Sequence, residues 1–262
     1  MLDFGFYNMD CMQGMKEFPD KYFDLAIVDP PYRNEKENQP TKDMRKNGMM
    51  QTFGNKPQKE YFDELFRVSK NQIIWGANNF ELPPYKGFVV WKKKTISENF
   101  TMSMAEIAFI SEGLGTISKV FEYQPQGTKD EKRIHPTQKP VRLYEWLLAN
   151  YAKPGEIILD THVGSGSSLV ACRNMNFKYV GFEIDETYFK KAKDRIEQHA
   201  AQMNIFDFMT TEGSEHNNDD SMAILKAMQE SADAVRNSPK YDFSCVKELL
   251  DKDGADKEND RK

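Results

Sequence analysis

The sequence predicts an α/β fold in three layers, with a mostly parallel central sheet and helices on both faces. Short apolar runs alternate along the chain with segments whose apolar residues recur at helical spacing, as in parallel strands joined by helices. Several apolar runs end in an acidic residue near prolines or glycines, which is typical of a ligand-binding edge of a sheet. Hydrophobic residues make up 39% of the 262 residues, which is enough for a globular core.

The pattern predicts each element in chain order. Strands are expected at residues 4–7, 24–29, 73–75, 88–91, 105–110, 157–160 and 179–184. Helices are expected at residues 59–69, 141–151, 168–175 and 186 to about 202. Residues 33–57 and 113–135 are expected to be loops, because each is polar and carries several Lys and Arg residues.

The acidic charge of the chain is concentrated after residue 205. The formal net charge is −5, but residues 207–262 alone hold 14 acidic and 8 basic residues, so the preceding part is close to neutral. We therefore expect one main domain over residues 1–205 and an acidic, partly helical extension over residues 206–262. The helical spacing in the extension fits packing on the main domain or on a second subunit of a homodimer.

Several other classes of protein are disfavoured. The three cysteines, Cys11, Cys172 and Cys245, are widely spaced and the four histidines lack ligand spacing, so neither a disulfide framework nor a metal site is expected. No apolar run approaches the roughly 20 residues that span a bilayer, and the first residues lack the layout of a secretory signal. We expect a cytoplasmic protein without a membrane segment.

The most informative segment is Asp29-Pro30-Pro31-Tyr32, directly after an apolar strand. An aromatic amine is a weak nucleophile, because its lone pair is delocalised into the ring. The Asp29 carboxylate and the Pro30 carbonyl could bind the two amine hydrogens and favour the positive charge that develops during attack. Pro30 and Pro31 stiffen the turn, and Tyr32 offers a flat face for an unstacked base. The alternative is a proline-rich turn with an aspartate cap.

A second segment has the features of a cofactor loop. Residues 160–168 (DTHVGSGSS) connect a strand to a helix, and the glycines allow a tight turn and close approach of a ligand. About twenty residues later the next strand ends in Glu183 and Asp185, where an acid is placed to bind ribose hydroxyls. No lysine follows the glycines at the spacing of a phosphate-binding loop, which disfavours a nucleoside triphosphatase.

A third segment, residues 135–140 (HPTQKP), opens the helix that is expected at residues 141–151. Lys139 could neutralise the carboxylate of a ligand at the start of this helix. The alternative is an ordinary proline in the first helical turn.

Together these segments resemble the amino-methyltransferases of DNA, and their order resembles the permuted β group of that family. The motifs are D-P-P-Y, H-P-T-Q-K-P, D-x-x-x-G-S-G-S-S and G-F-E-I-D, with the catalytic motif ahead of the cofactor glycines. Asn8-Met9-Asp10-Cys11 resembles the adenine-binding segment of that group, and residues 75–80 (WGANNF) resemble a segment of phage and restriction-type adenine enzymes. The resemblance covers roughly residues 3–200 and implies a Rossmann-like methyltransferase fold, with an antiparallel strand at one edge of the sheet.

The resemblance also implies roles for individual residues. Within the catalytic motif of residues 29–32, Asp29 and Pro30 would hold the target amine, and Tyr32 would stack on the flipped base. The residues expected to bind S-adenosyl-L-methionine are Asp10, Cys11, Lys139, Asp160, His162, Gly164, Gly166, Ser167, Ser168, Glu183 and Asp185. In the family, D-P-P-Y leans toward N6 of adenine, whereas S-P-P-Y leans toward N4 of cytosine.

The expected function is therefore transfer of a methyl group from S-adenosyl-L-methionine to N6 of a flipped adenine in double-stranded DNA, as in restriction-modification systems. The alternatives are N4 of cytosine, an RNA or protein substrate, and a non-catalytic DNA-binding module with the same fold. The sequence departs from the family at residues 160–162, where Asp-Thr-His replaces the usual Asp-Pro-Phe. The usual recognition insert before residue 135 is short, so either the recognised DNA sequence is short or the basic loop at residues 33–57 shares in reading it. Residues 33–57 and 113–135 are the candidate DNA-recognition loops.

Overall fold

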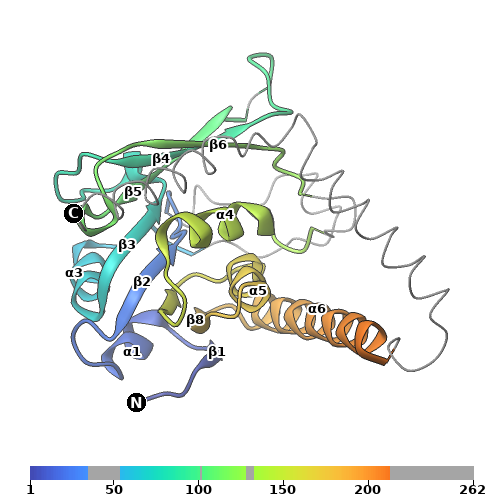
Figure 1. Cartoon of the computed structure of the whole chain (residues 1–262). Helices are drawn as coiled ribbons and strands as arrows, with labels where there is room; N and C mark the ends of the chain where they lie inside the picture. Colours follow the sequence, from blue (N-terminus) through green and yellow to red (C-terminus); the bar gives the residue numbers. More distant parts are fainter. Residues whose placement is uncertain (35–53, 101, 128–132, 213–262) are drawn as a thin grey trace, which may run out of the picture. The chain divides into compact units, whose positions relative to one another are not determined.

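The computed structural model describes residues 1–34, 54–100, 102–127 and 133–212 (Figure 1). The chain divides into two compact units, Met1–Ala201 and Gln202–Lys262. Of the second unit, only the end of helix α6 (Glu186–Glu212) is described, so most of the expected acidic extension lies outside the described residues, as do residues 35–53 of the first expected loop. No helix in the described part of the chain has the length and apolar character needed to cross a membrane.

The first unit is built on one eight-stranded sheet with the strand order β1-β8-β7-β2-β3-β5-β4-β6. Its strands are β1 (Gly5–Asn8), β2 (Phe23–Val28), β3 (Ser69–Trp75), β4 (Phe88–Lys93), β5 (Ala105–Ile110), β6 (Lys119–Tyr123), β7 (Ile157–Asp160) and β8 (Lys178–Glu183). The other α-helices are α1 (Cys11–Lys16), α3 (Lys59–Val68), α4 (Val141–Tyr151) and α5 (Ser167–Asn174). Two 3-10 turns, η1 (Ala77–Asn79) and η2 (Glu112–Leu114), follow β3 and β5. Since β5 alone runs antiparallel to its neighbours, the expected mostly parallel sheet is confirmed.

Two details of the expected fold are wrong. The antiparallel strand is not at an edge: β5 lies between β3 and β4, and the edge strand is β6, which is parallel to β4. Residues 113–135 are not all loop, because β6 forms within them. Lys119 and Glu122 give β6 a polar sequence, but Phe121 packs on Trp146 of α4 with ring centroids 5.2 Å apart. Tertiary contacts therefore decide the structure of this segment.

Helix α1 forms directly after β1, where no helix was expected. Asp10 caps it by accepting a hydrogen bond from the backbone N–H of Met12 at 2.7 Å. Its inner side is buried through Gly14 and Met15. The aspartate that was noted as a possible ligand contact is thus also a helix cap.

Both faces of the sheet are covered by helices. Neighbouring residues of a strand point to opposite faces, so they enter different core layers. Leu25 of β2 lies in a core layer with residues of α4 and α5, whereas Ala26 lies in a layer with residues of α1 and α3. Figure 1 shows the corresponding helices on the two sides of the sheet. Trp75 and Trp91 lie in the core and are 0% and 2% exposed.

Between β2 and β7, near the centre of the sheet, the connections after the two strands diverge to opposite faces of the sheet. Strands β2 and β7 are parallel neighbours, but the helices that follow them, α3 and α5, cover opposite faces. In such sheets a crevice opens at the carboxyl ends of the two strands, and ligands bind there. Asp29 follows β2 and Asp160 ends β7, so the fold places both acids at this crevice.

Candidate active site

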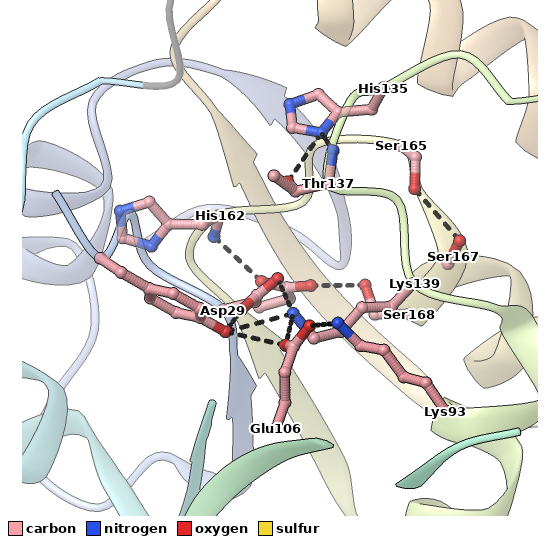
Figure 2. Close-up of polar contacts among 12 residues, drawn as sticks. Asp29, Lys93, Glu106, His135, Thr137, Lys139, His162, Ser165, Ser167 and Ser168 are labelled. Atoms are coloured by element: carbon pink, nitrogen blue, oxygen red, sulfur yellow. Dashed lines mark hydrogen bonds and ion pairs between the residues drawn. The ribbon is translucent and has the colours of Figure 1, made fainter. Parts of the chain in front are cut away.

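The carboxylate of Asp29 lies in a network of charged side chains from four segments (Figure 2). Its Oδ1 accepts a hydrogen bond from the Tyr32 hydroxyl at 2.6 Å, and its Oδ2 pairs with Nζ of Lys139 at 2.5 Å. The same Nζ lies 3.0 Å from Oε2 of Glu106, whose Oε1 lies 2.6 Å from Nζ of Lys93. We call this group the Asp29 cluster: Asp29, Tyr32, Lys93, Glu106 and Lys139.

Burial and charge pairing compete within the Asp29 cluster. Burial raises the pKa of Asp29, and although Lys139 opposes this effect, Glu106 adds to it. Burial also opposes ionisation of Glu106, but Lys139 and Lys93 outweigh it and lower the pKa of Glu106 to about 2. For Lys139, burial favours the neutral amine, but the two carboxylates outweigh it and raise its pKa. Glu106 and Lys139 are therefore charged at neutral pH.

Tyr32 lies against the backbone of the segment that follows β3. Gly76 has a φ of +71°, and a Cβ atom there would meet Cε1 of Tyr32 at 2.2 Å. The Tyr32 ring also packs edge-on against Phe80, with ring centroids 6.1 Å apart. Nζ of Lys139 lies 5.7 Å from the centroid of the Tyr32 ring and 5.6 Å from that of Trp75. The segment of residues 75–80 thus contributes to the site by leaving room for Tyr32.

The glycine-rich segment connects β7 to α5. The Asp160 carboxylate accepts hydrogen bonds from the backbone N–H of His162 at 2.9 Å and from the hydroxyl of Ser168 at 2.5 Å. Burial raises the pKa of Asp160 to about 7. Gly164 and Gly166 have φ values of +54° and +80°, a region that L side chains rarely adopt. The glycines are therefore needed for the turn itself, whatever they bind.

Backbone amides orient the two acids at the end of β8, Glu183 and Asp185. Oε2 of Glu183 accepts a hydrogen bond from the N–H of Gly164 at 2.8 Å, and its Oε1 accepts one from the N–H of Asp185 at 2.9 Å. Asp185 in turn caps α6 by accepting from the N–H of Tyr188 at 2.9 Å. Each carboxylate oxygen can accept more than one hydrogen bond, so Glu183 keeps acceptor capacity for ligand hydroxyls.

The protein surrounds three other predicted cofactor residues, Ser167, His162 and Cys11. The Ser167 hydroxyl accepts a hydrogen bond from Arg195 at 2.9 Å. The His162 ring packs edge-on against Tyr61, with ring centroids 5.3 Å apart, and burial lowers the pKa of His162 to about 4. Burial also raises the pKa of the Cys11 thiol to about 12. At neutral pH, His162 and Cys11 are therefore uncharged.

The predicted residues form three contact groups. The first joins Asp29 and Tyr32 to Lys139. We expected Lys139 beside a ligand carboxylate, and its contact with a cofactor remains a prediction. The second group joins Gly164 and Asp185 to Glu183, and the third joins His162 and Ser168 to Asp160. Within the residues that the structure describes, no group of three or more His, Cys, Asp or Glu side chains could hold a metal ion.

Sequence reasoning missed two members of the Asp29 cluster. Glu106 and Lys93 lie in strands β5 and β4, outside the motifs that we singled out. Their signal is a single acid inside the apolar strand AEIAFI and a lysine two residues after Trp91. A charge that faces a core needs a partner, so each was a candidate for a polar site.

Known proteins resemble this chain in sequence and fold. Residues 85–194 match the N6_N4_Mtase family model, described as DNA methylase. YubD of Escherichia coli (strain K12), named as a candidate methylase, is 25% identical over 210 residues, or 73% of this chain and 89% of that protein. The type II methyltransferase M.HpaI of Haemophilus parainfluenzae is 22% identical over 243 residues, or 76% of this chain and 74% of that protein. The solved structure of PvuII DNA methyltransferase (cytosine-N4-specific) covers 76% of this chain and 91% of its own, at 12% identity and a TM-score of 0.52.

These comparisons bear on fold and family separately. The likeness to the PvuII structure, together with the strand order, confirms the Rossmann-like methyltransferase fold. The family model covers the strand that carries Glu106, the HPTQKP segment, the glycine-rich segment and Glu183. The similarity to M.HpaI extends over more of the chain than the family model does. Over residues 85–194 the chain is therefore similar to the N6/N4 family of DNA methylases.

Proposed function

We propose that this protein is a DNA methyltransferase that uses S-adenosyl-L-methionine to methylate N6 of an adenine flipped out of the duplex. The observation that carries the proposal is the Asp29 carboxylate at the carboxyl end of β2, where both of its oxygens already bind hydrogen-bond donors. Such a carboxylate can bind an exocyclic amine in the same way. The match to the DNA methylase model supports DNA as the substrate class. The D-P-P-Y motif, which in the resembled family leans toward N6, favours adenine.

The residues at the ends of β7, β8 and β1 fit S-adenosyl-L-methionine. Glu183 is oriented by two backbone amides and keeps lone pairs for ribose hydroxyls. Gly164 and Gly166 keep side chains out of the turn, which allows a ligand to approach the backbone. Asp10 at the end of β1 is proposed to contact the cofactor adenine. When bound, the cofactor supplies an electrophilic methyl group.

The chain's own part in transfer is to orient the amine and stabilise its charge. One amine hydrogen would be donated to Asp29 and the other to the carbonyl oxygen of Pro30, which directs the nitrogen lone pair toward the methyl group. The nitrogen gains positive charge as it attacks, and the nearby Asp29 carboxylate stabilises that charge. The nitrogen sheds one proton after attack, so no strong base is required.

The experiment that tests this function is methyl transfer from labelled S-adenosyl-L-methionine to unmethylated genomic DNA, followed by nucleoside analysis. We expect N6-methyladenine. N4-methylcytosine would retain the mechanism and correct the base. If the protein binds the cofactor but forms no DNA product, the proposal is wrong and RNA or protein becomes the substrate to test. Failure to bind the cofactor would instead favour a non-catalytic DNA-binding module.

Substitution of Asp29 tests the assignment of the site. Asp29→Ala removes the acceptor for the amine, so we expect transfer to be abolished while affinity for the cofactor, measured by calorimetry, is retained. The matched control is Asp63→Ala, which removes an exposed carboxylate that pairs with Lys59 on α3. Transfer by Asp29→Ala at the rate of this control would contradict the assignment.

A further inference from the structure

The Asp29 cluster poses a problem for the proposed reaction. Both oxygens of Asp29 are engaged, one by the Tyr32 hydroxyl and the other by the Lys139 ammonium. A target amine must replace these donors, and a positive charge next to Asp29 opposes the charge that develops on the amine. Lys139 cannot move into solvent easily, since its side chain is only 4% exposed. The ammonium therefore needs a second anionic partner inside the protein.

Glu106 is placed to be that partner. Its Oε2 lies 3.0 Å from Nζ of Lys139 and 3.2 Å from the Tyr32 hydroxyl, so it already contacts both groups that engage Asp29. Its Oε1 is held by Lys93 at 2.6 Å, which fixes the carboxylate from the other side. Figure 2 shows Glu106 between Lys139 and Lys93. A short shift of Lys139 toward Glu106 would release Asp29 without exposing either charge.

We propose that Glu106 is a positioning residue for methyl transfer: it takes over the Lys139 ammonium and the Tyr32 hydroxyl when the target amine binds Asp29. This inference rests on the proposed function. No bond is made or broken in the exchange, because each donor only changes its acceptor. Glu106 and Lys139 keep their charges throughout, while Asp29 becomes available to the amine.

Neutralising Glu106 should trap Lys139 on Asp29. In Glu106→Gln the ammonium has Asp29 as its only anionic partner within the Asp29 cluster, so it competes more strongly with the target amine. Lys139→Met in the same protein removes this competitor, so Oδ2 of Asp29 is then free to bind the amine. Lys93 loses its ion pair with residue 106 in Glu106→Gln and in the double variant alike. The effect of this loss therefore cancels when the rates of the two variants are compared.

The test compares the wild type, Glu106→Gln, Lys139→Met and the double variant in methyl transfer to unmethylated genomic DNA at saturating cofactor. We expect Glu106→Gln to lower kcat/KM by about 100-fold, the size of effect that misplaced reacting groups produce. We expect the double variant to recover about 10-fold of that loss. Affinity for S-adenosyl-L-methionine, measured by calorimetry, should stay near that of the wild type in Glu106→Gln, and melting curves verify folding of all four proteins.

The control is Glu122→Gln, which neutralises an exposed glutamate paired with Lys92 and should keep the wild-type rate. A double variant no faster than Glu106→Gln would overturn the inference, because a residue that only supports the fold would not be rescued by removing Lys139. Wild-type activity in Glu106→Gln would overturn it as well. In both cases the wild type still methylates DNA, so the proposed function stands. Absence of transfer by the wild type would instead overturn the function, and the inference with it.

Discussion

The contact between Gly76 and Tyr32 allows the strongest test of how the site is held. Gly76→Ala would place a Cβ atom 2.2 Å from Cε1 and 2.5 Å from Cδ1 of Tyr32. These distances are far below van der Waals contact, so the ring must move. Its hydroxyl, which now lies 2.6 Å from Oδ1 of Asp29, would move with it. The substitution therefore acts on the site without changing any of its polar groups.

The expected cost has two parts. An alanine at a φ of +71° strains the backbone by about 1–2 kcal/mol, whatever surrounds it. Displacing Tyr32 adds an overpacking cost of about 1–3 kcal/mol. The hydrogen bond from Tyr32 to Asp29 involves an ionisable group, and its loss adds to this second part. We expect Gly76→Ala to lower the free energy of unfolding by about 2–5 kcal/mol and the rate of methyl transfer by about 100-fold.

Gly155 provides the matched control. Its φ is +88°, but a Cβ atom there has no neighbour within 4 Å, so Gly155→Ala has the backbone strain without the clash. Urea unfolding measures the free energies, and labelled transfer to genomic DNA measures the activity. In a Tyr32→Ala background the cost of Gly76→Ala should fall to that of Gly155→Ala, because the clash is gone. Equal costs for the two glycine substitutions in the wild-type background, with full activity, would refute the reasoning.

Two further substitutions test separate parts of the fold. His162→Phe keeps a ring against Tyr61 but removes a group whose pKa burial lowers to about 4. As pH falls from about 6.5 to about 4, the imidazole binds a proton in the unfolded chain but not in the folded protein, so the wild type loses stability. The variant should therefore be more stable than the wild type by about 1–2 kcal/mol at pH 5 and about equally stable at pH 8. Melting curves at both pH values measure the difference. Gly14→Ala should destabilise the protein by about 1–3 kcal/mol in urea, because the new Cβ would lie 2.4 Å from the Phe182 ring, although alanine is normally the better residue inside a helix. A variant as stable as the wild type would show that α1 can shift away from β8.

Most of the sheet could be predicted from apolar runs, and the exceptions have physical causes. The start of β3 (Ser69–Trp75) was missed because its first residues are polar, and polar residues indicate a loop when partners are unknown. In the fold, Ser69 and Gln72 are buried and bond to each other, with Nε2 of Gln72 donating to Oγ of Ser69 at 3.0 Å. Strand β6 was missed because its structure depends on pairing with β4, a long-range contact that local periodicity does not reveal.

The site, like the sheet, has parts that the sequence reveals and parts that depend on long-range contacts. Asp29, Asp160 and Glu183 could be found from the sequence, because strand ends followed by prolines or glycines are recognisable without knowing any contact. The pairing of Lys139 with Asp29 could not be found from the sequence, because the two residues are 110 positions apart and meet only through the order of the strands. Motif reasoning therefore assigned Lys139 to a ligand, although its nearest anions belong to the protein.

Glu106 shows what further signal the sequence contains. The strand AEIAFI is apolar apart from this one acid, and β5 lies inside the sheet rather than at its edge. A carboxylate in such a strand must either become protonated or meet cations, because isolated burial of its charge costs far more than one contact returns. Two lysines meet it here, one from the neighbouring strand β4 and one from the segment before α4, and they keep it ionised. A single acid in an otherwise apolar interior strand therefore predicts converging lysines or arginines, and in this protein those lysines lead to Asp29.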